Sequence, residues 1–117
     1  MVRWLAAFLF TQIVECPIYV AGLREPSRST AVKVAVAFGA SALTHPVVWF
    51  VIPWCWYDVL GARSYWAMAV VAETFAIAAE GLYFRRFGVR RPWLWALGAN
   101  MASVTLGLAS RYAFGWP

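Results

Sequence analysis

The sequence predicts an all-α integral membrane protein in which four transmembrane helices form one compact bundle. Of its 117 residues, 63% are hydrophobic and 13% are charged, and the mean hydropathy is +0.66. A soluble domain of this size has too little interior to bury so much apolar surface. Four apolar runs alternate with short polar connections, and each approaches the ~20 residues that cross a bilayer core as a helix. The runs are 4–23, 31–54, 65–84 and 93 to about 110.

The first run, 4–23, resembles a cleaved signal peptide in having Arg3 ahead of an apolar stretch. Polar residues from Thr11 onwards interrupt the apolar core, however, and a similar segment recurs later in the chain. We therefore expect the run to remain as the first span, with Glu15 near its middle. Pro17 lacks the N–H of a helical hydrogen bond and predicts a kink beside this acid.

The second run places Ser41, Thr44 and His45 on one helical face, at spacings of three and four residues. Lipid offers these polar groups no hydrogen-bond partner, so the face is expected to turn towards the other helices. Hydrogen bonding between helices is the simplest role for the two hydroxyls, and a hydrogen-bonded interior position is the simplest for His45. Pro46 predicts a second kink next to the histidine.

The third and fourth runs carry the remaining polar stripes. Glu73 and Glu80 lie two turns apart on one side of the third run, and Asn100 and Ser103 share a face of the fourth. A carboxylate that faces lipid costs at least ~3 kcal/mol, so all four stripes are expected to converge. Glu80 is expected to be shallow and to reach towards Arg85. Glu15 and Glu73 have no Lys or Arg at their depth, so each should carry a proton, share one or hold a cation.

The two halves of the chain resemble each other, which predicts one domain over 1–117 built from a duplicated hairpin, about 4–54 and 65–114. Each half has a span with an acid, a basic connection, and a span with the pattern Gly-Ala-[Ser/Asn]-x-x-[Ser/Thr]. Two such copies run parallel, about an axis along the bilayer normal. The glycines are expected at close helix contacts. The aligned pairs are Glu15 with Glu73, Gly39 with Gly98, Ser41 with Asn100, and Thr44 with Ser103.

The net charge of +5 is interpreted as a topology signal and not as a nucleic-acid-binding surface. Seven Lys and Arg residues flank the first and third connections, and three lie on the other side. The excess places both basic connections in the cytoplasm and both termini outside, in a bacterial inner membrane. The seven are Arg24, Arg28, Lys33, Arg85, Arg86, Arg90 and Arg91, and the three are Arg3, Arg63 and Arg111.

Three classes of function suit a polar site buried in such a bundle. We favour a small transporter or ion-coupled membrane protein that binds a proton or a cation. An accessory or assembly subunit of a larger membrane complex comes second, because a chain with little mass outside the bilayer needs a partner subunit or copies of itself. The predicted binding residues are Glu15, Ser41, His45, Glu73, Glu80, Asn100 and Ser103.

The third class is an intramembrane enzyme that uses a divalent cation to activate water. Carboxylates and imidazole are suitable ligands for such an ion, and no catalytic residue is assigned beyond them. The sequence contains no spaced metal-binding motif, so an enzyme is the least favoured of the three. The candidate metal ligands are Glu15, His45, Glu73 and Glu80.

Overall fold

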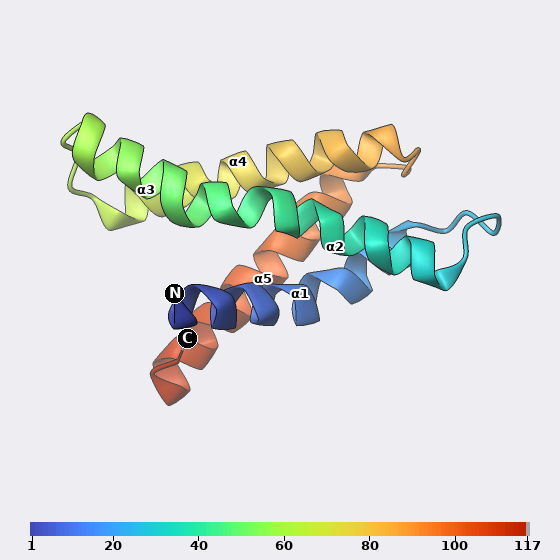
Figure 1. Cartoon of the computed structure of the whole chain (residues 1–117), viewed down its shortest axis with the longest axis horizontal. Coiled ribbons are helices and arrows are strands. Elements are labelled where there is room, and N and C mark those ends of the chain that lie inside the picture. Colours follow the sequence, from blue (N-terminus) through green and yellow to red (C-terminus); the bar gives the residue numbers. More distant parts are fainter. Residues whose placement is uncertain (117) are drawn as a thin grey trace.

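The computed structural model describes residues 1–116 and consists of four long helical rods joined by short connections (Figure 1). The second rod is one continuous helix, Thr30–Val59, in which the helix type changes along its length. The all-helical fold predicted from the sequence is thus confirmed. The helices are α1 (Val2–Gly22), α2 (Thr30–Pro46), η1 (Val47–Val51), α3 (Ile52–Trp54), η2 (Cys55–Val59), α4 (Tyr65–Arg86) and α5 (Pro92–Phe114).

Three of the four rods are long and apolar enough to cross a membrane: Val2–Gly22, Thr30–Val59 and Tyr65–Arg86. The fourth, α5, has 23 residues and is about 34 Å long at ~1.5 Å per residue. Its composition is less apolar, because Asn100, Arg111 and two serines lie along it. The predicted fourth span therefore has the expected length but not the apolar character of the other three.

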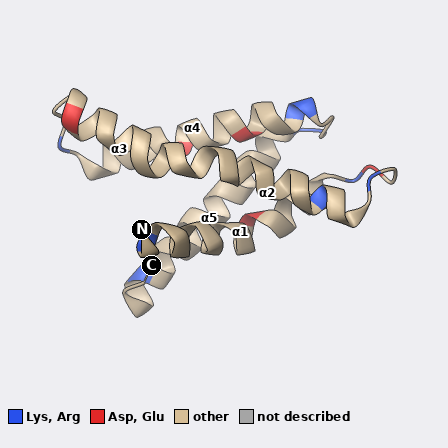
Figure 2. Ribbon diagram, in the orientation of Figure 1, with Lys and Arg blue, Asp and Glu red and all other residues tan. Residues whose placement is uncertain are grey.

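The rods alternate in direction, so that the two basic connections lie at the same end of the molecule (Figure 2). The connection between η2 and α4 and the two chain termini lie at the opposite end. Each rod packs against two neighbours: α1 against α2 and α5, and α4 against the same two helices. The interior is therefore bounded by all four rods.

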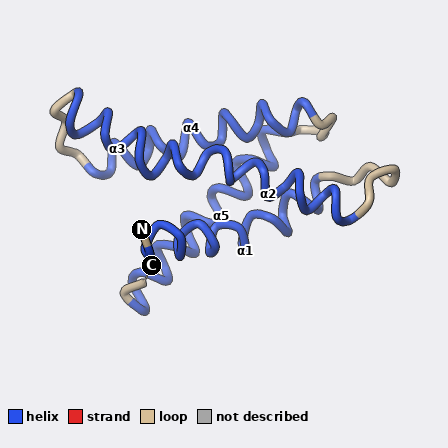
Figure 3. The backbone as a smooth tube through the Cα atoms, in the orientation of Figure 1, coloured by secondary structure: helices blue, strands red, loops and turns tan. Residues whose placement is uncertain are grey.

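Capping residues and the connections explain where the helices begin (Figure 3). The Ser29 side chain accepts a hydrogen bond of 3.3 Å from the N–H of Val32, and Ser64 accepts one of 3.2 Å from Ala67. Both serines satisfy an N–H group that has no partner within its own helix. Between α4 and α5 the chain reverses through Gly88, whose φ of +73° suits glycine.

The two prolines have different effects on their helices. Pro17 lies inside α1, which remains α-helical from Val2 to Gly22. After Pro46 the next five residues form π-helical turns. A proline removes one helical hydrogen bond, and a local change to π geometry lets neighbouring groups find other partners. At Pro46, where a kink was predicted, the helix changes from α to π geometry.

Small side chains allow the helices to approach one another. Ala37, Ala40, Ala96 and Ala99 are fully buried on α2 and α5. Three of these, Ala37, Ala40 and Ala99, form one cluster with the two largest buried rings, those of Tyr19 and Phe84, whose centroids are 4.2 Å apart.

The glycines at close contacts are partly different from those predicted. At Gly39 an added Cβ would lie 2.6 Å from the hydroxyl of Tyr83, as expected for a close approach. At Gly98 it would meet no atom within 4 Å, so that prediction is wrong. Two further glycines, which were not predicted, also lie at close contacts: the Trp95 ring approaches Gly22, and the Trp93 ring approaches Gly81.

Candidate functional site

Two carboxyl groups lie in the interior of the bundle, where the polar faces of all four helices meet. Glu15 on α1 and Glu80 on α4 are 2% and 1% exposed. Side chains from the neighbouring helices hydrogen-bond to both. We call the seven residues that take part the polar network: Glu15, Tyr19, Ser41, Thr44, Glu80, Asn100 and Ser103.

Each oxygen of the Glu15 carboxyl accepts a hydrogen bond from a serine. Ser41 on α2 donates to Oε2 at 2.6 Å, and Ser103 on α5 donates to Oε1 at the same distance. Both serines are buried. The carboxyl group therefore joins the two helices that pack on either side of α1.

Glu80 is bound by three donors. Its Oε1 accepts a hydrogen bond of 2.6 Å from Thr44 on α2. Its Oε2 accepts one of 2.8 Å from the amide of Asn100 on α5 and another from the hydroxyl of Tyr19 on α1. The Glu80 carboxyl group thus contacts all three of the other rods.

No basic side chain balances these acids within residues 1–116. The one ion pair in this range joins Arg28 to Glu25 at 3.2 Å, in the first connection. Among the described residues, Glu15 forms no ion pair. The expected approach of Glu80 to Arg85 is wrong, because the Glu80 carboxyl group lies in the core and is not directed towards Arg85.

The hydrogen bonds follow the same scheme at both acids. Each acid accepts one bond from the second helix of its own hairpin: Glu15 from Ser41, and Glu80 from Asn100. Each also accepts one from the second helix of the other hairpin: Glu15 from Ser103, and Glu80 from Thr44. The bond from Tyr19 to Glu80 has no counterpart at Glu15. The donors from the second helices are the pairs that the sequence alignment matched. The acid that corresponds to Glu15 in this scheme is therefore Glu80.

Two of the hydroxyl groups have a second acceptor within reach. The Ser103 hydroxyl lies 3.0 Å from the carbonyl oxygen of Asn100, and that of Thr44 lies 3.3 Å from the carbonyl oxygen of Ala40. A hydroxyl has one proton to donate and can also accept. Either one can therefore donate to its carboxylate, or accept from a protonated carboxyl group while donating to the backbone.

Glu73 and His45 lie outside the polar network, although both were predicted to belong to it. Glu73 is partly buried, and within residues 1–116 its carboxyl group has no hydrogen-bond partner. His45 is 7% exposed and is surrounded by aromatic rings, with centroid distances of 5.2 Å to Phe8, 5.8 Å to Trp49 and 6.0 Å to Trp4. Its Nδ1 has no partner among the described residues.

The metal site suggested by the sequence is not assembled. Over the described chain, no three His, Cys, Asp or Glu side chains come together in a way that could hold a metal ion. The reason is geometric: His45 faces the aromatic rings, and Glu73 lies two turns along α4 from Glu80.

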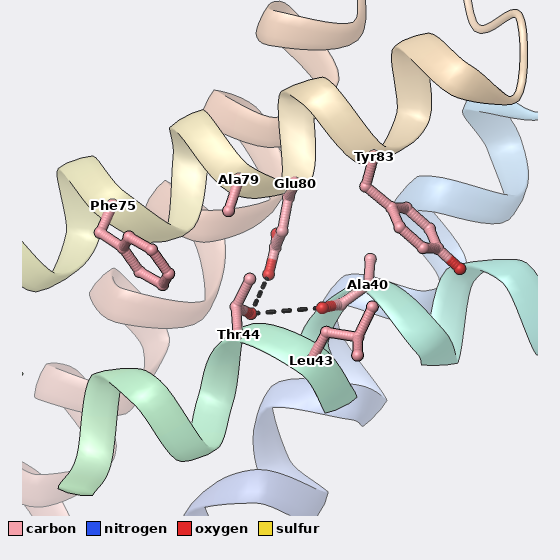
Figure 4. Close-up of a pocket in the computed structure, with 7 residues that line it drawn as sticks. All are labelled: Ala40, Leu43, Thr44, Phe75, Ala79, Glu80 and Tyr83. Carbon is pink, nitrogen blue, oxygen red and sulfur yellow. Dashed lines mark hydrogen bonds between the residues drawn. The ribbon is translucent and has the colours of Figure 1, made fainter. Parts of the chain in front are cut away.

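A pocket of about 210 Å³ opens beside Glu80, between α2 and α4 (Figure 4). Glu80 and Thr44 point towards each other across it, with Phe75 and Tyr83 on either side along α4. The remaining lining residues are Ala40, Leu43 and Ala79. One of the two buried acids therefore lines a pocket, although its side chain is only 1% exposed.

The predicted binding residues omitted two network members, Tyr19 and Thr44, although Thr44 lies on the predicted polar face of the second run. Tyr19 was the harder of the two to predict. It lies four residues after Glu15, on the same helical face, which is the one sequence signal that points to it. An aromatic residue at a helix face is usually part of the apolar core, and most of the Tyr19 ring is indeed packed against Phe84. Only its hydroxyl reaches Glu80.

Comparison with models of protein families, with curated proteins and with solved structures finds no match to this chain. Its function is therefore inferred from the geometry of the polar network and the pocket.

Proposed function

We propose that this chain is a small membrane transporter in which Glu15 and Glu80 bind a proton or a cation and exchange it across the bilayer. The observation that carries the proposal is that two carboxyl groups are buried in one helical core and have no basic partner among the described residues. A carboxylate in such a place is costly unless it takes up a proton or a cation. Purely structural hydrogen bonding could be achieved with neutral side chains alone.

The hydroxyl groups around the acids support this proposal, because they can hydrogen-bond to the carboxyl groups in either charge state. Thr44 and Ser103 each have a backbone carbonyl as a second acceptor. The same geometry therefore serves a carboxylate and a protonated carboxyl group, with no buried donor left without an acceptor. A site that must gain and lose a proton repeatedly needs this property.

The proposal includes insertion of all four rods in a bacterial inner membrane, with the basic connections in the cytoplasm and the termini outside. The lower apolar character of α5 suits a helix that is shielded on one side by α1 and α4. The two hairpins are proposed as parallel copies about an axis along the bilayer normal. The shared bonding scheme supports this relation, with Glu15 matched to Glu80 in place of Glu73.

Ion flux in liposomes tests the proposal. The full chain is reconstituted with a pH-sensitive dye inside, and gradients of protons, Na⁺, K⁺ or an organic ammonium ion are imposed in turn. Wild-type protein should move protons under at least one gradient. Glu15→Gln and Glu80→Gln should reduce this flux by at least about tenfold, because each removes the ionisable group and keeps the side-chain volume.

Glu25→Gln is the matched control, since Glu25 lies in the first connection and is paired with Arg28. It should keep the wild-type flux. Glu73→Gln tests the acid that the sequence alignment paired with Glu15 but that lies outside the polar network. This variant should also retain most of the flux. If both network variants transport as well as wild type, or if wild type moves none of these ions, the transporter proposal fails and the accessory-subunit alternative replaces it.

A further inference from the structure

The pocket beside Glu80 combines one polar end with apolar walls. Its polar end is formed by the Glu80 carboxyl group and the Thr44 hydroxyl, and its walls by Leu43, Phe75 and Ala79. The Tyr83 hydroxyl does not add a second polar end, because it donates to the carbonyl oxygen of Val36 at 2.9 Å. A ligand that matches this lining has one charged or hydrogen-bonding end and an apolar remainder.

The charge of the polar end favours a cation. The Thr44 hydroxyl donates its hydrogen bond to Oε1 of Glu80, on the side of the carboxyl group that lines the pocket (Figure 4). When Thr44 donates to the carbonyl oxygen of Ala40 instead, at 3.3 Å, Oε1 is free to accept a bond from a ligand. The Thr44 oxygen is then available as a second acceptor. Two acceptors and a negative charge match an ammonium group, which has N–H donors and no acceptor.

The walls and the volume favour a small organic ion over a metal ion or a large ligand. Beyond the two oxygens at the polar end, the apolar walls give a metal ion no oxygen ligands, and hard cations prefer about six. At ~30 Å³ per water molecule, about 210 Å³ holds roughly seven waters, and this is smaller than the usual pocket for a drug-sized compound. The volume suits a ligand of about eight non-hydrogen atoms.

The route to the pocket is lateral. Leu43 is 66% exposed and Phe75 is 37% exposed, so the opening lies on the outer surface of the bundle, between α2 and α4. In a membrane this surface faces the acyl chains. An ammonium ion with an apolar body concentrates at a bilayer surface and could enter from there.

We propose that this pocket binds a small organic ammonium ion, with its charged end on Glu80 and Thr44 and its apolar end between Phe75 and Tyr83. The inference rests on the proposed function, since it names the class of cation that Glu80 exchanges for a proton. Binding of the ammonium ion to the carboxylate releases the proton that Glu80 held, so one positive charge replaces another.

Benzylammonium and benzyl alcohol provide a matched pair of probes, because they have the same size and shape and differ in charge. Binding of each to the purified full-length protein in nonionic detergent is measured at neutral pH by calorimetry. Wild type should bind benzylammonium at least about tenfold more tightly than benzyl alcohol. Glu80→Gln should remove this preference.

Ala79→Leu tests the pocket without altering the polar network, since the larger side chain fills the volume beside Glu80. It should weaken benzylammonium binding at least about tenfold. Ala78→Leu adds the same side chain at the exposed neighbouring position, outside the pocket, and should keep the wild-type affinity. This pair decides the question even if Glu80→Gln does not fold.

Equal affinity for the two probes, or unchanged benzylammonium binding in Ala79→Leu, would overturn the ammonium site. Such a failure is distinct from failure of the proposed function. If benzylammonium does not bind while Glu80→Gln still abolishes proton or inorganic cation flux in liposomes, the ammonium inference falls and the transporter proposal stands.

Discussion

Replacing Gly81 with alanine should destabilise the bundle, because an indole ring covers this position of α4. A Cβ at residue 81 would lie 2.6 Å from Cζ3 and 3.1 Å from Cδ2 of Trp93. The contact is with the rigid ring system and not with the end of a flexible chain, so α5 or α4 must shift. Overpacking of this kind typically costs ~1–3 kcal/mol. Alanine in a helix gains ~0.5–1 kcal/mol over glycine. The net loss in free energy of unfolding should therefore be up to about 2.5 kcal/mol, with a middle value of about 1.3 kcal/mol.

Gly98 provides the control, since the same substitution there meets no atom within 4 Å. Only the helix-propensity term remains, so Gly98→Ala should raise the free energy of unfolding by ~0.5–1 kcal/mol. The two variants can be compared by titrating the protein from nonionic micelles into sodium dodecyl sulfate and following helix content by circular dichroism. If Gly81→Ala is as stable as Gly98→Ala, the packing of Trp93 on α4 described above is incorrect.

Three further predictions concern the polar network, a helix contact and the topology. Glu80→Gln should change the free energy of unfolding by less than ~1 kcal/mol, because the glutamine amide can donate to the Thr44 hydroxyl. Glu80→Ala should lower it by ~2–4 kcal/mol, because it leaves buried donors without an acceptor. Both are measured by the same titration. Tyr83→Phe should cost ~0.5–1.5 kcal/mol in that assay, since it deletes one hydrogen bond to a backbone carbonyl. With the native cysteines replaced by serine, Arg63→Cys should react with an impermeant maleimide on intact cells, and Arg90→Cys only after permeabilisation; the reverse pattern would invert the topology.

The positions of the helices could be predicted because apolar runs end sharply at charged connections. The first run, 4–23, agrees closely with Val2–Gly22, and 65–84 agrees with Tyr65–Arg86. The second helix extends five residues beyond the predicted end at residue 54. Its last turns are π-helical, and a pattern based on the 3.6-residue period of an α-helix does not detect them.

The inward faces of the helices could also be predicted. Which of the two acids on α4, Glu73 or Glu80, lies at the level of the polar network could not. Glu73 and Glu80 are seven residues apart and point in nearly the same direction, so helical phase does not distinguish them. Which of the two meets Thr44 and Asn100 depends on how far α4 slides along its neighbours. Contacts such as Trp93 on Gly81 fix that position, and spacing along one helix carries no information about them.

The polar network also suggests how a change in protonation could act on the packing of the hairpins. Glu15 can take up a proton on Oε1 without leaving a donor unsatisfied, because Ser103 has a second acceptor. The same is true of Glu80, whose Oε1 faces Thr44. In both cases the oxygen that can take up the proton, Oε1, faces the hairpin to which the acid does not belong. Each protonation therefore reverses a hydrogen bond between the two hairpins and leaves the bonds within each hairpin intact. In a transporter that works by alternating access, the interface between the two repeats is the part that changes.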